Sequence, residues 1–388
     1  MLITKTKVPI KIWADVVEDS CLTQAVNIAD NMPVYDHLAL MPDCHSGYGM
    51  PIGGVLPLID GISPNCVGVD IGCGMSCIRT NLHREDVPLE LQGKIFSEIR
   101  ATIPVGFNHN KEKQSWSGFD RVPKIDIIQD QLDSAKYQLG SLGGGNRGGN
   151  HFLSEFQKDK DNNVYVMLHS GSRNLGLKIA EHYHKLAVEH GIVPRIKDLA
   201  YFSSGTPLFD EYLEAMNYAL EFAYANRHLM MEKTISIIQK YIPKMQVIDF
   251  YNIHHNYAVE DRSIGKGIYL HRKGATNASS DTIGLIPGSM GSNSYIVRGR
   301  GNPESFNSCS HGSGRRMSRG EAKKKISKEE YWKSLEDAGL EVNRNDNRVY
   351  IDEAPGAYKD IHEVMENQKD LVEIVVELTP FGYPAIKG

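Results

Sequence analysis

Residues 163–191, NVYVMLHSGSRNLGLKIAEHYHKLAVEHG, contain a strand pattern followed directly by a helix pattern. Apolar side chains alternate over positions 164–168, which predicts a β-strand that ends near His169. Apolar residues then recur at helical spacing over positions 179–186, and Gly191 predicts the end of that helix. A histidine is therefore expected where a strand ends, at the start of a Gly-Ser-Arg turn.

The same two patterns recur along the chain. Short strands are predicted at 266–274, 294–299 and 372–380, and helices at 125–139 and 208–241. These elements do not alternate as regular βαβ units. We therefore expect an α+β fold rather than a doubly wound sheet, with residues 1–388 forming one large mixed domain.

The composition is ordinary for a globular protein, with 41% hydrophobic and 23% charged residues. The formal net charge of -5 argues weakly against a nucleic-acid surface that covers the whole molecule, because such surfaces are commonly positive. One basic region remains, and it consists of Arg298, Arg300, Arg315, Arg316, Arg319, Lys323, Lys324 and Lys325. On charge alone, such a run is more often a solvated helix face than a binding site.

The six cysteines are few for a chain of 388 residues, and no secretory pattern precedes them. We therefore expect free thiols in a reducing, cytoplasmic protein. No apolar run approaches the roughly 18 residues that a membrane span requires, so no membrane partner is expected.

Glycine gathers in four segments that also carry histidine, cysteine or asparagine. These segments are 47–74, 140–149, 284–301 and 312–320. Because glycine lets the backbone approach a ligand closely, glycine-rich loops with polar residues indicate a site assembled from distant parts of the chain.

The segment GVDIGCGM at 68–75 places Asp70 and Cys73 three positions apart, with glycines on both sides of Cys73. A carboxylate and a thiolate on one tight loop can reach the same metal ion, and a thiolate can bridge two ions. Taken alone, a buried structural cysteine explains the segment somewhat better.

Four further segments carry histidine. They are GNRGGNHF at 145–152, HSGSR at 169–173, NIHHNYA at 252–258 and SCSHGSGRR at 308–316. Neutral imidazole is the commonest protein ligand of transition metals, although each histidine singly is as easily a core residue. Adjacent side chains diverge, so at most one of His254 and His255 is expected to face a given metal. The glycine run before Asn150 has the composition of a loop that exposes N–H groups to phosphate.

The combination of cysteine, histidine and carboxylate suggests zinc, manganese or iron. The spacing of a zinc finger is missing, as is HExxH, so dispersed ligands in loops favour an open catalytic centre. Neither GxxxxGK[ST] nor KxDG occurs, which argues against a P-loop NTPase and against a lysine nucleophile. If a nucleotide is activated covalently, a histidine is a competent nucleophile.

Seven segments together resemble the RtcB family of RNA-splicing ligases and follow the family's order along the chain. They are PDCHSGYGMPIGGV, GVDIGCG, GNHF, HSGSR, HHN, IPGSMGSNSYIVRG and SCSHGSGR. The resemblance extends from about residue 40 to the terminal Lys-Gly.

The resemblance implies two Mn²⁺ ions held by Asp70, Cys73, His151, His169 and His255, with Cys73 as the bridge. It also implies that GTP guanylylates His311. The implied nucleotide contacts are Asn150, His151, Glu155, His255, Asn256, Pro287, Gly288, Ser289, Met290, Ser294, His311, Gly312, Ser313, Gly314 and Lys387. Without the resemblance, Lys387 reads as part of a solvated tail.

One segment departs from the family. The stretch GGGNRGGNHF is four residues longer than a family-like GGGNHF, and Ser154 occupies the position where the family has a glutamate that contacts the nucleotide. We take Glu155, one position later, as the counterpart of that glutamate.

The implied activity joins RNA ends that carry a 2′,3′-cyclic phosphate or 3′-phosphate to ends that carry a 5′-hydroxyl. The substrate would be broken tRNA or another structured RNA, and a small archease-like activator accompanies some family members. Arg315 and Arg316 are candidates for holding RNA phosphates, since arginine binds them bidentately. Two alternatives stay open from the residues alone: a dinuclear metallophosphoesterase acting on RNA ends, and a non-enzymatic RNA-binding scaffold that uses the basic region at 298–325.

Overall fold

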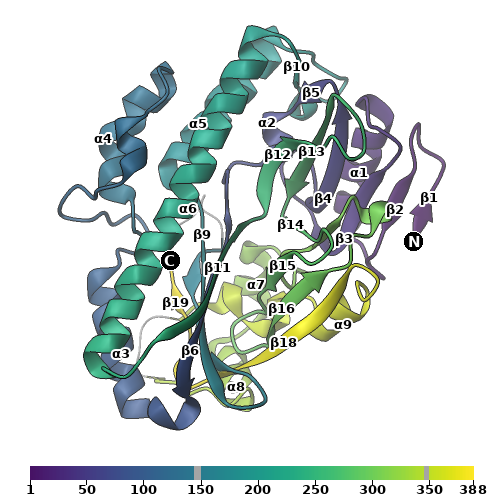
Figure 1. The fold of residues 1–388 in the computed structure, drawn as a ribbon. Helices are drawn as coiled ribbons and strands as arrows, with labels where there is room; N and C mark the ends of the chain where they lie inside the picture. The colour runs from purple at the N-terminus through teal and green to yellow at the C-terminus, as the bar shows by residue number, and fades with distance from the viewer. Residues whose placement is uncertain (144–149, 345–348) are drawn as a thin grey trace.

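The computed structural model describes residues 1–143, 150–344 and 349–388. Within these ranges the chain forms two large sheets and helices that pack on them (Figure 1). The glycine run at 144–149, expected to expose N–H groups, lies outside the described residues. The expectation of one domain over 1–388 stays a prediction.

The larger sheet has nine strands. Its main path is β11 (Val247–His254), β6 (Gly74–His83), β9 (Asn163–Ser170), β8 (Phe156–Lys158), β18 (Val372–Phe381), β16 (Ser294–Gly299) and β15 (Ile283–Ile286), and β7 (Phe152–Leu153) joins β9 to β19 (Ile386–Lys387). The second sheet runs β1 (Leu2–Ile3), β2 (Ile10–Ile12), β3 (Leu38–His45), β4 (Ile52–Ile59), β13 (Ile268–Lys273) and β12 (Asn256–Glu260).

Two short pairs complete the sheet structure of the described residues. They are β5 (Gly61–Ile62) with β10 (Phe202–Ser203) and β14 (Ala275–Asn277) with β17 (Ser308–Ser310). Among the named strands of the described ranges, only β2 and β3 pair in parallel. A mainly antiparallel sheet with helices beside it is an α+β fold, so the expectation of α+β is confirmed.

The helices are α1 (Asp19–Asn31), α2 (Pro64–Val67), α3 (Leu89–Thr102), α4 (Asp126–Gln138), α5 (Arg173–His190), α6 (Pro207–Tyr241), α7 (Arg319–Lys325), α8 (Lys328–Asp337) and α9 (Ile361–Glu366). The predicted helices at 125–139 and 208–241 are confirmed as α4 and α6. The helix read from 163–191 is α5, and it ends at Gly191, whose N–H bonds to the carbonyl of Ala187.

Helix α6 is the long element that positions the site. It begins where Thr206 caps the first turn and Pro207 takes the first helical position. Its buried face packs on β6, β9 and β11, and Figure 1 shows it running along those strands. None of the helices in the described residues is both long and apolar enough to cross a membrane.

Candidate active site

The register of three adjacent strands brings distant residues together. Gly74, at the start of β6, pairs with His254 at the end of β11 and with Ser170 at the end of β9. Cys73, His255 and His169 therefore meet at the same end of three neighbouring strands. The backbone N–H of His255 also donates to the carbonyl of Cys73 at 2.8 Å.

The side chains form two overlapping groups with Cys73 in both. In one group, Cys73 Sγ lies 3.2 Å from His169 Nε2, which lies 3.2 Å from His255 Nε2. In the other group, Cys73 Sγ lies 3.6 Å from His151 Nε2, which lies 2.8 Å from an oxygen of Asp70. All five predicted metal ligands thus lie together, and Cys73 is the residue that the two groups share.

In two of these histidines, the hydrogen-bond partner of Nδ1 shows which ring nitrogen carries the proton. Nδ1 of His151 lies 3.0 Å from the carbonyl of Leu142, and Nδ1 of His169 lies 2.6 Å from the carbonyl of Asn150. A carbonyl only accepts hydrogen bonds, so both rings carry their proton on Nδ1 and turn a lone pair on Nε2 toward Cys73. The thiol of Cys73 has one proton and can donate to only one of these nitrogens, whereas a metal ion would accept all of the lone pairs. The donor set therefore fits a metal ion.

Burial shifts the pKa values of the five predicted metal ligands. It lowers the pKa of His151, and it lowers the pKa values of His169 and His255 well below the ordinary value, which keeps the rings neutral as ligands must be. Burial opposes ionisation of Asp70, but His151, Cys73 and Arg173 together lower the pKa of this carboxyl. Burial and the neighbouring Asp70 raise the pKa of the Cys73 thiol well above its ordinary value. Only a nearby cation would make this sulfur a thiolate.

Two glycines permit the close packing of these loops. Gly72 has a φ of 71°, and a Cβ there would lie 2.8 Å from the Cβ of Ala223 on α6. A Cβ at Gly171 would lie 2.2 Å from a carboxylate oxygen of Asp70. Larger residues at these positions would push the Cys73 loop away from α6 and from β9.

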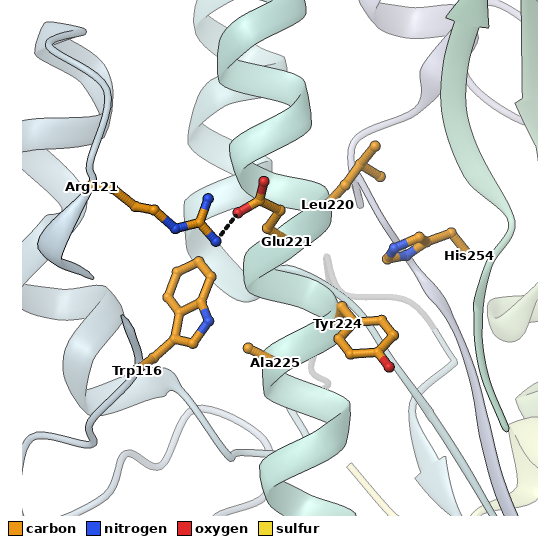
Figure 2. Close-up of a pocket in the computed structure, with 7 residues that line it drawn as sticks. All are labelled: Trp116, Arg121, Leu220, Glu221, Tyr224, Ala225 and His254. Atoms are coloured by element: carbon orange, nitrogen blue, oxygen red, sulfur yellow. Dashed lines mark ion pairs between the residues drawn. The ribbon is translucent and has the colours of Figure 1, made fainter. Parts of the chain in front are cut away.

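His254 and His255 diverge, as expected. The ring of His254 points toward α6, where it helps to line a pocket of about 300 Å³, and Figure 2 shows this direction. The other residues that line the pocket are Trp116, Arg121, Leu220, Glu221, Tyr224 and Ala225. This pocket lies between α6 and the end of β11, whereas the side chain of His255 faces Cys73 and His169.

His311 lies beside the metal ligands through a second strand pairing. It follows β17, which pairs with β14, and Ala275 of β14 donates its N–H to the carbonyl of His255. The rings of His311 and His255 have centroids 4.7 Å apart. The predicted nucleophile is thus adjacent to a predicted ligand.

Asp43 also contacts His311. This carboxylate is fully buried, and one of its oxygens accepts a hydrogen bond from the backbone N–H of His311 at 3.1 Å. The same oxygen lies 2.7 Å from Nδ1 of His311, which is an ion-pair distance without the angle of a hydrogen bond. Our sequence reasoning missed Asp43, although it belongs to the segment PDCHSGYGMPIGGV.

Lys387 is an interior residue. It lies on β19 opposite Phe152, and only 10% of its side chain is exposed. Its ammonium donates to the side-chain oxygen of Asn150 and, at 2.6 Å, to Glu353. The reading as a solvated tail is therefore wrong. Lys387, Asn150 and Glu353 together form what we call the Lys387 cluster. No sequence pattern indicated Glu353.

The predicted turn at 287–294 lies against the His311 loop. The N–H of Gly288 donates to the hydroxyl of Ser294 at 3.2 Å. A Cβ at Gly312 would lie 3.3 Å from the carbonyl oxygen of Pro287. Asn256 joins the other side of the site, since its side chain donates to the carbonyl of Asp70 and accepts from the N–H of Gly274.

In the segment that departs from the family's pattern, Glu155 rather than Ser154 contacts the turn at 287–294. The carboxylate of Glu155 accepts the N–H of Gly291 at 3.0 Å. The hydroxyl of Ser154 instead donates to the carbonyl of Glu155 and accepts the N–H of Met167. The position of Glu155 is consistent with its predicted place, while its contact with a nucleotide stays a prediction.

Glu155 gives a prediction about pH. Burial raises its pKa from 4.5 to about 7, so the folded chain binds a proton that the unfolded chain has already lost between these values. Stability should therefore fall as pH rises through this window, by up to about 3 kcal/mol. Denaturant unfolding of the wild type and Glu155→Gln from pH 4.5 to 8 measures this. Parallel pH profiles for the two proteins would contradict it.

The basic residues of the 298–325 region lie on more than one element. Arg298 and Arg300 lie on or beside β16, whereas Lys323, Lys324 and Lys325 are exposed on α7. The guanidinium of Arg315 lies beside the Lys387 cluster, where it donates to the hydroxyl of Tyr358 at 2.6 Å.

Comparison with known proteins yields one family. The family model described as tRNA-splicing ligase RtcB matches residues 24–126 and 118–387. The chain is 40% identical to the RNA-splicing ligase RtcB of Escherichia coli K12, over 97% of both proteins. It is 30% identical to the tRNA-splicing ligase RtcB of Thermococcus kodakarensis, over 97% of this chain and 95% of that protein. It is 32% identical to the RNA-splicing ligase RtcB homolog 1 of Entamoeba dispar, over 93% and 81% respectively.

Proposed function

Because this chain belongs to the RtcB family of tRNA-splicing ligases, we propose that it is a GTP- and Mn²⁺-dependent RNA ligase. It would join a 2′,3′-cyclic phosphate or 3′-phosphate end to a 5′-hydroxyl end, in RNA splicing or repair. The observation that carries the proposal is the position of His311, whose ring lies beside both the buried carboxylate of Asp43 and the ring of His255, a proposed metal ligand.

Five residues would hold two Mn²⁺ ions. Asp70, Cys73 and His151 would bind one, and Cys73, His169 and His255 the other, since these are the two groups whose donor atoms converge. Bound ions would neutralise phosphate charge and polarise the reacting phosphorus. The mixture of one thiolate with imidazoles and a carboxylate is compatible with manganese.

His311 would act as the nucleophile. The carboxylate of Asp43 favours the proton on Nδ1, which leaves the lone pair of Nε2 free. Nε2 would attack the α-phosphorus of GTP, form a phosphorus–nitrogen bond and release pyrophosphate. Water would open a cyclic phosphate to a 3′-phosphate, which would then take the guanylate from His311. The 5′-hydroxyl would attack the capped 3′-phosphate and displace GMP.

The Lys387 cluster and the 287–294 turn would bind the nucleotide. Lys387 and Asn150 already contact each other, and a guanine base offers acceptors for the ammonium and the amide. Ser294, Glu155 and the turn Gly312–Gly314 surround the same region through their contacts with residues 287–291. The RNA substrate would be broken tRNA or another structured RNA. An archease-like activator stays a prediction. The six free cysteines fit a location in the cytoplasm.

Asp43→Asn should slow guanylylation of the chain by about 100-fold or more. The amide keeps the size of the side chain but removes the negative charge that favours the proton on Nδ1 of His311. Correct positioning of a group that holds or transfers a proton typically changes a rate by about 100-fold or more. Single-turnover adduct formation with labelled GTP measures the effect. A rate within threefold of the wild type, at equal Mn²⁺ affinity, would show that Asp43 does not set the state of His311.

Ligation of defined RNA ends separates this proposal from a metallophosphoesterase. An RNA with a 2′,3′-cyclic phosphate and a partner with a 5′-hydroxyl should be joined with GTP and Mn²⁺, and not with ATP. Phosphate release from the same ends without GTP, unchanged in His311→Ala, would instead support hydrolysis. The contact of His311 with Asp43 favours ligation, because hydrolysis gives His311 no special role.

A further inference from the structure

Arg227 is a fully buried arginine on α6, in the middle of the helix face that packs on the sheet. In the described part of the chain, no carboxylate lies within 4.0 Å of its guanidinium. A buried charge without an ion-pair partner is costly, so a purely structural position would favour an apolar residue. The proposed function assigns Arg227 no role.

Three of its five N–H groups bond to segments that carry the proposed metal ligands, and a fourth faces His254 beside another ligand. One terminal nitrogen donates to the carbonyls of Gly72 at 2.8 Å and Ser170 at 2.9 Å. Nε donates to the side-chain oxygen of Asn252 at 2.7 Å, and the second terminal nitrogen lies 3.0 Å from Nδ1 of His254, which also lies 3.1 Å from the carbonyl of Gly72. Gly72, Ser170 and His254 are each one residue away from Cys73, His169 and His255.

We propose that Arg227 is a positioning residue that holds the Cys73, His169 and His255 segments at the spacing at which they share a metal ion. This inference rests on the proposed metal centre. One rigid, planar side chain fixes the ends of β6, β9 and β11 relative to one another. The ligand side chains then need no rearrangement when an ion binds.

The neighbouring Asn226 extends the same arrangement to the second group. Its side-chain oxygen accepts the N–H groups of Gly140 and Ser141, and its amide donates to the carbonyl of Gly171. The next residue, Leu142, provides the carbonyl that orients His151. Two consecutive residues of α6, Asn226 and Arg227, therefore bond to segments next to both groups of proposed metal ligands.

Arginine is specifically suited to this position. Its planar fork presents donors in fixed directions, whereas lysine has a single flexible ammonium with three donors. Arg227→Lys keeps the positive charge but cannot bond to Asn252 and to the carbonyls of Gly72 and Ser170 at once. Residues that orient ligands in this way typically change metal affinity about 10- to 100-fold when replaced.

The test is Mn²⁺ binding to the full chain without nucleotide or RNA, by calorimetry or by the electron paramagnetic resonance of the free ion. Arg227→Lys should bind Mn²⁺ about 10- to 100-fold more weakly than the wild type. At saturating Mn²⁺ its guanylylation rate should return toward that of the wild type. A merely structural role would lower the unfolding temperature and leave the affinity of the folded chain unchanged.

Two further variants make the result decisive. Asn252→Ala removes the acceptor of Nε, together with an exposed hydrogen bond from Asn252 to the carbonyl of Tyr224, and it should weaken Mn²⁺ binding about fivefold. It decides the matter if Arg227→Lys does not fold. Ile238→Val shortens a buried side chain of the same helix that has no hydrogen-bonding group, and it should bind Mn²⁺ like the wild type.

The role of Arg227 would be overturned if the folded Arg227→Lys, or Asn252→Ala in its place, bound Mn²⁺ within twofold of the wild type. A wild-type chain that bound no divalent ion would give a different result, because it would reject the metal centre itself. The two failures are distinguishable from the wild-type titration alone.

Discussion

His311→Ala should abolish both guanylylation of the chain and joining of RNA ends, with a fall of at least about 10⁴-fold in ligation rate. The structure places this ring beside His255 and next to a buried carboxylate, so no other described histidine has the same combination of neighbours. Gel-resolved ligation of a 2′,3′-cyclic phosphate end to a 5′-hydroxyl end, with GTP and Mn²⁺, measures the loss.

Binding of Mn²⁺ should survive the His311→Ala change, because the ring is not one of the five converging ligands. The matched control is His190→Ala, which removes an exposed ring at the end of α5 and should ligate like the wild type. Ligation by His311→Ala above about one tenth of the wild-type rate would contradict a histidine-guanylate route.

Cys73→Ala should remove the metal centre. Its sulfur is the one atom that both ligand groups share, so the change takes a ligand from each of the two proposed ions. The affinity for Mn²⁺ should fall at least about 100-fold, which exceeds the usual loss for residues that only orient ligands. Ligation should fall below detection. Calorimetric titration of the metal-free protein, followed by ligation at each Mn²⁺ concentration, measures both effects.

Cys77→Ala is the matched control for this change. Cys77 is also a fully buried cysteine of the β6 segment, but it belongs to neither ligand group. Its variant should keep the Mn²⁺ affinity of the wild type and lose only packing. Equal Mn²⁺ affinity in Cys73→Ala and Cys77→Ala would contradict the assignment of Cys73 as a bridge.

Local patterns were sufficient to predict the strands β9, β13, β16 and β18 and the helices α4, α5 and α6, because the evidence for each lies within a few residues. The alternation before His169 and the helical spacing up to Gly191 are complete in one short segment. The five proposed metal ligands were predictable from the resemblance to the RtcB family, although each one singly was as easily a core residue. Their convergence was not, because it depends on the pairing of Gly74 with two strands far away in the sequence.

The supporting residues left no such signal. Asp43 acts on a histidine 268 positions away, and Arg227 bonds to a carbonyl 155 positions away. A single aspartate in a strand or arginine in a helix is ordinary in any sequence, so only the fold identifies these contacts. The position of Glu155 was open for another reason, because a local insertion shifts register and only the contact with Gly291 distinguishes it from Ser154.

The most direct test of the central claim is identification of the residue that receives guanylate. The wild-type chain is incubated with labelled GTP and Mn²⁺, digested, and the labelled peptide is sequenced by mass spectrometry under conditions that preserve acid-labile bonds. The account predicts one acid-labile guanylate on His311, formed with Mn²⁺ and absent after chelation. Guanylate on any other residue, or no adduct with any of several divalent ions, would contradict it.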